Sequence, residues 1–263
     1  MRLPAAKKEL GQHFLVDENI LGVIGRLAGL APEDVVLEVG PGLGVLTAYL
    51  ADRVARVHAI ELDRSLDAPL SERLSGQGNV DLHFGDALRL DLDALDPAPT
   101  KLVSNLPYNV ATPLVVESLD GLPTLQLWCV MVQREVADRF FGEPSTKAYG
   151  AVSVLVQLAA GRTGFHAVSR TVFRPRPNVD SALVAFRRRR GVNTEDLARV
   201  KKVVTAAFAH RRKRLANSLE LAGLSTRREA EAALAEIGRD PRVRAEELAP
   251  PEFVALTNAL GRE

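Results

Sequence analysis

The sequence predicts an α/β protein in which a mostly parallel sheet is followed by a small helical domain. Over roughly the first half of the chain, short apolar runs alternate with segments of helical spacing, as in βαβ units. Near residue 190, helical spacing alone remains. Residues 187–263 carry 17 basic and 11 acidic side chains, a net charge of +6, whereas residues 1–186 carry a net charge of −5. We therefore expect two domains, 1–190 and 191–263.

The overall composition is that of an ordinary globular protein. The 263 residues are 46% hydrophobic and 25% charged, and the net charge is only +1. The chain lacks the run of about eighteen apolar residues that a membrane-spanning helix needs. Residues 1–10 have no apolar run behind their positive charges, so we expect no secretory signal peptide. The one cysteine, Cys129, lies in an apolar run and is expected to be a core residue.

Seven strands are expected, and each ends at a turn or at a polar residue. They span 35–39, 56–60, 80–84, 101–104, 125–132, 162–168 and 181–187. Segments of helical spacing separate the first five strands, and the segment with Ile20, Ile24 and Leu27 has Asp17 as a possible cap. A short proline-rich loop joins the last two strands, which suits an antiparallel pair at the edge of the sheet.

Residues 191–263 are expected to be entirely helical. Thr194 can cap the first helix, and Thr226 with Glu229 matches a capping box. Gly238 is a typical helix stop, and Pro250 can open a last short helix. The apolar positions that keep helical spacing are Leu197, Val200, Val204, Phe208, Leu215 and Leu219.

A glycine-rich loop follows the first of these strands. Gly40, Gly42 and Gly44 let the backbone turn tightly and let a ligand approach the main chain. A dinucleotide-binding loop would have its third glycine at position 45, where this chain has Val45. The spacing therefore disfavours a nicotinamide-dependent dehydrogenase.

Two carboxylates follow the second and third strands. Glu61 comes 21 residues after Gly40 and can accept both hydroxyls of a ribose, while Asp86 can accept from an adenine amino group. Taken singly, each could be a helix cap. Because the carboxyl ends of neighbouring strands meet at one edge of an open sheet, the set favours an adenosine cofactor without a pyrophosphate. We expect S-adenosyl-L-methionine.

The motif Asn105-Leu106-Pro107-Tyr108 follows the fourth strand. The exocyclic amine of adenine is a poor nucleophile, because its lone pair is delocalised into the ring. The side-chain carbonyl of Asn105 and the backbone carbonyl of Leu106 can accept its hydrogens and stabilise the charge that develops during methyl transfer. Pro107 holds Leu106 extended, and Tyr108 offers a ring on which a flipped-out base can stack. The alternative is an asparagine cap followed by a proline turn.

Further segments occur in the order in which one family has them. They are 11–15, 133–137, 147–150, 173–181 and 208–219. With the glycine loop and the motif at 105–108, they cover nearly the whole chain. The sequence resembles the KsgA/RsmA-type ribosomal RNA small-subunit adenine N6-dimethyltransferases.

The resemblance implies a class I S-adenosylmethionine-dependent methyltransferase (Rossmann-like) fold with a C-terminal all-helical domain. It also implies dimethylation of two adjacent adenines near the 3′ end of small-subunit (16S) rRNA. The family usually has asparagine where this chain has His13, so we expect cofactor binding with altered pH sensitivity; on composition alone His13 is an exposed loop residue. The implied cofactor contacts are His13, Leu15, Gly40, Gly42, Glu61, Asp86 and Asn105.

Two further assignments concern the RNA. Phe173 is either a ring that sandwiches the target base against Tyr108 or a core residue at a strand end, and the resemblance favours the first. Two basic clusters lie in the positively charged part of the chain, and we expect them to contact rRNA phosphates, although a solvated helix face is the usual explanation of such runs. The clusters are Arg187, Arg188, Arg189 and Arg190, and Arg211, Arg212, Lys213 and Arg214.

Two rival functions use the same fold. An Erm-type large-subunit rRNA methyltransferase is disfavoured by Leu106, where those enzymes more usually have isoleucine, and by the segment 173–181. A non-catalytic ribosome-assembly factor is disfavoured by the intact Asn105 and Tyr108. We expect a cytoplasmic, monomeric enzyme with the small ribosomal subunit as its partner, no metal and no membrane association.

Overall fold

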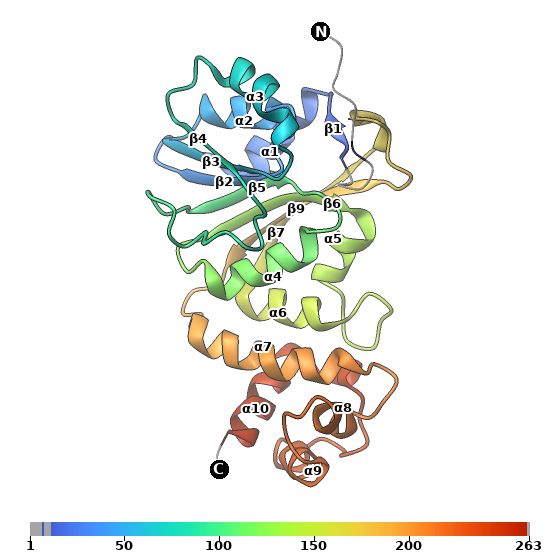
Figure 1. Ribbon diagram of the computed structural model, residues 1–263. Helices are drawn as coiled ribbons and strands as arrows, with labels where there is room; N and C mark the ends of the chain where they lie inside the picture. The colour runs from blue at the N-terminus through green and yellow to red at the C-terminus, as the bar shows by residue number, and fades with distance from the viewer. Residues whose placement is uncertain (1–6, 8–11, 262–263) are drawn as a thin grey trace. The chain divides into compact units, whose positions relative to one another are not determined.

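The computed structural model describes residue 7 and residues 12–261, which form two compact units (Figure 1). The first unit extends to Ala137 and also contains Arg162–Arg188, and the second contains Asp138–Gly161 and the residues from Arg189 onward. The expectation for residues 1–10 lies outside the described residues, Lys7 aside, and so does Gly11 of the segment 11–15. Within the described residues, no helix combines the length and the apolar character needed to cross a membrane.

The first unit is built on a seven-stranded sheet with the order β4-β3-β2-β5-β6-β9-β7. β2 is parallel to β3 and β5, β3 to β4 and β5 to β6, whereas β9 is antiparallel to β6. All seven expected strands are present, and β9 and β7 form the expected pair at one edge. The strands are β2 (Val35–Val39), β3 (Arg56–Glu61), β4 (Val80–Phe84), β5 (Lys101–Asn105), β6 (Leu127–Gln133), β7 (Ala160–Val168) and β9 (Ser181–Arg188).

Helices cover both faces of this sheet (Figure 1). α1 (Asn19–Ala28), α2 (Val45–Ala51) and α3 (Asp67–Leu74) lie on one face, and α4 (Ala111–Gly121) lies on the other with the start of α5 (Arg134–Phe140). The core under α1 and α2 includes Cys129, as expected. Burial raises the pKa of the Cys129 thiol to about 12, so this side chain stays protonated and apolar.

Two very short strands were not predicted. β1 (Phe14–Leu15) and β8 (Phe173–Arg174) form an antiparallel ladder in which Phe14 pairs with Arg174 and Leu15 with Phe173. A strand of two residues has no periodicity to read, so only the pairing reveals it. The ladder ties the segment before α1 to the loop between β7 and β9.

The regular elements of residues 191–261 are helices, as expected. The capping box of Thr226 and Glu229 is confirmed, Gly238 has a φ of +75° just after a helix end, and Pro250 begins the last helix. The helices of the second unit are α6 (Ala151–Ala159), α7 (Thr194–Ala209), α8 (Leu215–Leu221), α9 (Arg227–Glu236) and α10 (Pro250–Leu260), with a short 3-10 turn at Ala245–Glu247.

Two local expectations in this unit are wrong. The cap of α7 is Asn193, whose side chain accepts from the backbone N–H groups of Glu195 and Asp196; Thr194 is already helical. The apolar spacing also continues across a break, because α7 ends at Ala209 and residues 210–214 form a turn before α8. The second basic cluster therefore lies in a turn and not on a helix face.

The division into units differs from the expected domains at one place. The change at Arg188 lies close to the expected boundary, but the second unit also takes in residues 138–161. α6 of this segment packs against α7 and α10. The buried hydroxyl of Tyr149 donates to the carbonyl of Leu248 at 2.7 Å. Contacts between residues far apart in the chain attach this segment to the helices, and local spacing carries no sign of them.

A buried ion pair joins three elements of the first unit. Lys101 Nζ at the start of β5 lies 2.6 Å from Asp34 Oδ2, and both side chains are 9% exposed. The same ammonium donates to the carbonyl of Gly29 at 2.6 Å, at the C-terminal end of α1. Asp34 also accepts from the backbone N–H of Ala31 at 2.7 Å. The pair thus fixes the end of α1 against β2 and β5.

We expect Lys101→Ala to lower the free energy of unfolding by about 3–5 kcal/mol, because it leaves the Asp34 carboxylate buried without its partner. Urea denaturation of the purified protein measures this change. Arg242→Ala is the control, since it removes the exposed partner of Asp240, and we expect it to leave the midpoint almost unchanged. Equal losses in the two variants would contradict the assignment.

Candidate active site

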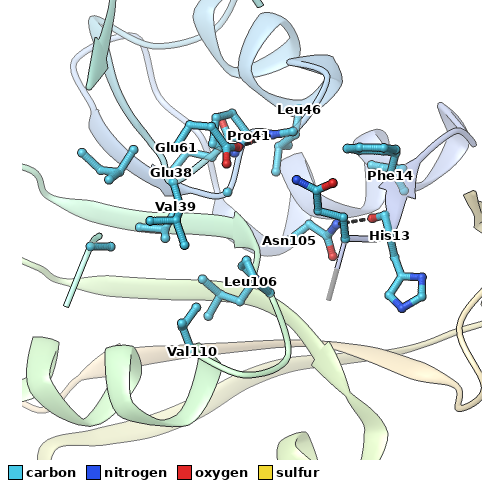
Figure 2. Close-up of a pocket in the computed structure, with 18 of the residues that line it drawn as sticks. His13, Phe14, Glu38, Val39, Pro41, Leu46, Glu61, Asn105, Leu106 and Val110 are labelled. Carbon is cyan, nitrogen blue, oxygen red and sulfur yellow. Dashed lines mark hydrogen bonds between the residues drawn. The ribbon is translucent and has the colours of Figure 1, made fainter. Parts of the chain in front are cut away.

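A pocket opens at the carboxyl ends of the parallel strands (Figure 2). Its walls come from the segment before α1, the glycine loop, the end of β3 and the loops after β4 and β5. Among the described residues, no group of three or more His, Cys, Asp or Glu side chains is placed to hold a metal ion. The sequence-predicted residues that line this pocket are His13, Leu15, Gly40, Gly42, Glu61, Asp86, Asn105, Leu106, Pro107 and Tyr108.

The glycine loop has no room for side chains at Gly40 and Gly42, because Pro107 and Phe14 pack against these two positions. Gly40 has a φ of +76°, and a Cβ there would lie 3.0 Å from Cγ of Pro107. Gly42 has a φ of +59°, and its Cβ would lie 3.1 Å from Phe14 Cδ1. A side chain at either position would combine backbone strain with a steric clash. The loop therefore forms a cradle whose backbone a ligand can approach.

Glu61 ends β3 with its carboxylate held by two backbone donors. Oε2 accepts from the N–H of Gly42 at 3.1 Å, and Oε1 accepts from the N–H of Asp63 at 2.8 Å. Burial raises the pKa of this carboxyl, and the two hydrogen bonds oppose the rise. Each carboxylate oxygen keeps a second lone pair for a ligand donor. The Glu61 carboxylate is thus an oriented acceptor, as the expected contact with the ribose hydroxyls requires.

Asp86 organises the turn after β4. Its Oδ1 accepts from the N–H of Leu88 at 3.0 Å, and its Oδ2 lies 3.4 Å from Nε of Arg89. The preceding Gly85 donates its N–H to the carbonyl of Glu61 at 2.9 Å. Asp86 is therefore a turn residue in this structure, and it also lines the pocket.

Asn105 stands at the end of β5 with its amide group oriented. Its Nδ2 donates to the backbone carbonyl of His13 at 3.3 Å, which leaves Oδ1 as an acceptor (Figure 2). The next residue, Leu106, is buried and donates its N–H to the carbonyl of Met131 at 3.1 Å. That bond prolongs the pairing of β5 with β6, so the turn begins only at Pro107 and the peptide of Leu106 stays fixed.

A hydrogen bond with β9 holds the side chain of Tyr108. Its hydroxyl lies 2.9 Å from Oγ of Ser181, the first residue of β9. Its ring centroid lies 5.5 Å from that of His13. Partial burial raises the pKa of the phenol, so the hydroxyl stays protonated. Ser181 thus positions Tyr108, and the sequence carried no local signal for this contact.

His13 contacts Asn105 through its backbone carbonyl, whereas its ring contacts the proline-rich loop. Nδ1 lies 2.7 Å from the carbonyl of Pro175. A carbonyl can only accept, so Nδ1 donates in this contact. In Figure 2 the ring points away from Asn105, whose amide instead meets the His13 main chain. The ring therefore fixes the proline-rich loop that follows β8.

Phe173 does not have the position expected of a base-stacking residue. Its side chain is 1% exposed and belongs to the hydrophobic core that contains Leu15 and Leu21. It is not among the pocket-lining residues. Of the two interpretations that the residues left open, the core position describes Phe173, because its pairing with Leu15 in the β1–β8 ladder brings the side chain into the core. Of the two rings expected to hold the target base, Tyr108 is the one that lines the pocket.

The first basic cluster is not a uniform RNA surface. Arg188 is partly buried and donates to three carbonyls, Leu125 at 2.7 Å, Leu119 at 2.8 Å and Leu122 at 3.0 Å. It therefore closes the C-terminal end of α4 and is unsuited to contact RNA, contrary to expectation. Arg187, Arg189 and Arg190 are exposed.

The second cluster is also divided. Arg211 donates to the carbonyl of Tyr149 at 2.9 Å and lies 3.6 Å from Glu246. This arginine therefore helps to hold the second unit together. Arg212, Lys213 and Arg214 are exposed in the turn between α7 and α8. For these three side chains, contact with rRNA phosphates stays a prediction.

Glu38 is the pocket residue that sequence reasoning missed. It lies within β2, is 1% exposed, and lines the pocket below Glu61 (Figure 2). Its Oε2 has no hydrogen-bond partner, and neither has the buried hydroxyl of the neighbouring Thr47 on α2. Burial raises the pKa of Glu38 to about 8, the nearby Thr47 hydroxyl opposes this rise, and the Glu61 carboxylate adds to it. An acidic residue inside an otherwise apolar strand was the available signal.

Comparisons with known proteins place this geometry in context. The family described as "Ribosomal RNA adenine dimethylase" matches residues 4–260. The chain is 49% identical to "Ribosomal RNA small subunit methyltransferase A" of Rubrobacter xylanophilus, over 97% of this chain and 95% of that protein.

Two solved structures share the fold. A dimethyladenosine transferase from Plasmodium falciparum is 22% identical, with a TM-score of 0.77 over 93% of this chain and 96% of that one. The 23S rRNA methyltransferase ErmE is 30% identical, with a TM-score of 0.66 over 95% of this chain and 100% of that one. The predicted class I methyltransferase fold is confirmed.

The proton on Glu38 generates a prediction. Above pH 4.5 an unfolded glutamate ionises, whereas the folded protein holds this proton up to a pKa of about 8. The native state thus binds more protons between these values, and stability falls as the pH rises through this interval. Glu38→Gln has no such group to ionise, so this loss of stability is absent from the variant. We therefore expect the melting temperature of Glu38→Gln, relative to that of the wild type, to rise from pH 5 to pH 8. A pH-independent difference between the two melting curves would refute the assignment.

Proposed function

The chain belongs to the ribosomal RNA adenine dimethylase family, and from this premise we propose that it dimethylates N6 of two adjacent adenines near the 3′ end of small-subunit (16S) rRNA. S-adenosyl-L-methionine is the proposed methyl donor. One observation carries the proposal: the acceptor motif Asn105–Tyr108 lines the same pocket as the glycine loop and Glu61. The name of the Rubrobacter relative, at 49% identity, favours the small subunit over the large-subunit substrate of ErmE, at 30%.

The residues of the pocket fit an adenosylated cation. The glycine cradle would be filled by a Cβ at Gly40 or Gly42, so it suits a ligand that lies against the backbone. The orphaned Oε2 of Glu38 and the oriented carboxylate of Glu61 suit a ligand that brings hydroxyl or ammonium donors. In this proposal Glu61 binds the ribose and Asp86 the adenine amine. The main chain around His13 and Leu15 closes the opposite wall.

The chain's own residues then orient the target amine. S-adenosylmethionine, when bound, supplies an electrophilic methyl group. The Asn105 side-chain carbonyl and the Leu106 backbone carbonyl accept the two hydrogens of the amine, which draws the nitrogen toward tetrahedral geometry and frees its lone pair. Tyr108, held by Ser181, stacks on the flipped base. No side chain has to remove a proton before transfer, because the methylated nitrogen is acidic and releases its proton afterwards.

RNA is the substrate class that the family implies. A monomer is the proposed active form. Arg212, Lys213 and Arg214 are the proposed phosphate contacts of the second unit, together with Arg187, Arg189 and Arg190 at the junction. Ribosomal particles assemble in the cytoplasm, where we expect the protein to act.

We expect the wild-type protein, incubated with labelled S-adenosylmethionine, to label adenines of unmethylated small ribosomal particles and not of large ones. Asn105→Ala removes an acceptor that acts on the amine during transfer, so we expect a fall in kcat of at least about 100-fold. Particle binding should stay within about twofold, because RNA affinity rests mainly on phosphate contacts. Mapping the labelled nucleotides and measuring particle affinity check both statements.

Tyr108→Phe is the matched control, because it keeps the stacking ring and removes only the hydroxyl that meets Ser181. It should retain far more activity than Asn105→Ala. Label on large-subunit adenines would support an Erm-type substrate. Particle binding without any label would support an assembly factor.

The exposed part of the second basic cluster generates a salt-dependent prediction. We expect the double variant Arg212→Gln and Lys213→Gln to bind small ribosomal particles more weakly, because two phosphate contacts are lost. The slope of log affinity against log salt should become shallower by about 1.5–2, the loss of two counterion-releasing contacts. Filter binding at a series of salt concentrations between about 50 and 300 mM measures this slope.

The control removes the same charge elsewhere in the second unit. Arg227 and Arg228 are neighbouring exposed arginines at the start of α9. Replacing both with glutamine should leave the slope as in the wild type. Identical slopes in all three proteins would exclude phosphate contacts at Arg212 and Lys213.

A further inference from the structure

An exposed aromatic ring lies on the edge strand of the first unit. Phe165 of β7 is 37% exposed. The guanidinium carbon of Arg134, the first residue of α5, lies 4.8 Å from the centroid of that ring. β7 is the last strand of the sheet, so its outer side faces no further strand of the described chain. A single exposed apolar side chain is ordinary on a protein surface, so the features that distinguish Phe165 are its arginine partner and its place on an edge strand.

A glycine on the same strand determines which way Phe165 points. A Cβ at Gly164 would lie 2.5 Å from Cδ2 of Leu27 on α1 and 3.6 Å from Cβ of Ala185. Gly164 therefore faces α1 with no room for a side chain. Successive residues of a strand point to opposite faces, so Phe165 points to the face on which α5 begins.

The pair of Arg134 and Phe165 is linked to Tyr108 through the start of β9. Gln133, just before Arg134, pairs with Ser181 across β6 and β9. The N–H of Arg134 donates to the carbonyl of Asp180 at 3.0 Å. Ser181 in turn meets the hydroxyl of Tyr108 at 2.9 Å. A continuous chain of direct contacts therefore joins the exposed pair to the residue proposed to stack on the target base.

The segment that carries Phe165 has a net positive charge, as nucleic-acid binding requires. The segment 162–181 contains four arginines and one acidic residue, Asp180, a net charge of +3. It lies within residues 1–186, whose net charge is −5. Arg174 and Arg176 are exposed in the loop that also contacts His13 at the pocket. The positive charge of this segment thus extends to the loop that contacts the pocket wall at His13.

We propose that Arg134 and Phe165 form a stacking platform for an unpaired base next to the target adenine, with Arg174 and Arg176 contacting the adjoining phosphates. This inference rests on the proposed function and adds a second RNA subsite to it. Aromatic rings and arginine planes are the groups on which proteins stack unpaired RNA bases. The platform keeps the RNA in register while the target base occupies the pocket.

Phe165→Leu tests the platform, because leucine keeps an apolar side chain and loses the ring. With unmethylated small ribosomal particles as the probe, we expect Kd and KM to rise by about tenfold, the lower range for loss of a base–aromatic contact. The kcat at saturation and the affinity for S-adenosylmethionine should stay within twofold of wild type. Phe165→Tyr keeps a stacking ring and should restore wild-type values.

A matched control exists on the same unit. Arg53 lies 3.7 Å above the ring of Tyr49, at the end of α2, and neither residue lines the candidate active site. Arg53→Gln breaks this similar pair and should leave particle binding unchanged. Chemical probing of the particles adds a positional readout, since wild type and Phe165→Tyr should protect a base beside the two target adenines and Phe165→Leu should not.

The outcomes separate this inference from the proposed function. A wild-type protein that labels no small-subunit adenine would remove the proposed function, and the platform with it. Normal labelling together with wild-type binding and protection in Phe165→Leu would overturn the platform alone. Equal weakening in Phe165→Leu and Phe165→Tyr would also overturn it, because a contact that the tyrosine ring does not restore is not stacking. Tenfold weaker binding rescued by tyrosine would support it.

Discussion

The parallel register of β2, β3, β4 and β5 is the constraint from which the pocket follows. Val39 lies opposite Ile60, and Glu61 lies opposite Phe84. The backbone carries this alignment beyond the strands, since Gly40 and Gly85 each donate to the neighbouring strand. The chain therefore leaves the sheet at one edge each time, and the glycine loop, the acidic residues and the motif at Asn105 meet there although they are far apart in the sequence.

The chemistry of this edge depends on burial as much as on residue type. Glu38 lies inside a strand with one carboxylate oxygen unpaired, and the neighbouring Glu61 adds negative charge to the same small volume. A site with this many acceptors is incomplete without a ligand that supplies donors or positive charge. The acidic balance of the first unit and the basic balance of the second correspond to two different partners, a small cation and an RNA.

A second set of long-range pairings gives the pocket its outer wall. The β1–β8 ladder brings His13 beside Tyr108 and buries Phe173. β9, antiparallel to β6, brings Ser181 to the hydroxyl of Tyr108. The methyl-transfer motif is thus supported by residues from three segments. Its geometry depends on the late part of the first unit, which returns to the sheet edge after α6.

The sequence by itself determined the strands, the helical character of residues 191–263 and the pocket motifs, because side-chain periodicity and turn residues act over a few neighbouring positions. Tertiary structure alone decided which side chains are available. Arg188 caps α4 although it stands in a run of four arginines, and Phe173 lies in the core although its loop is proline-rich. The proton on Glu38 likewise depends on burial by residues distant in the chain. Exposure, partners and charge state are set by contacts between separate segments, and local patterns do not record those contacts.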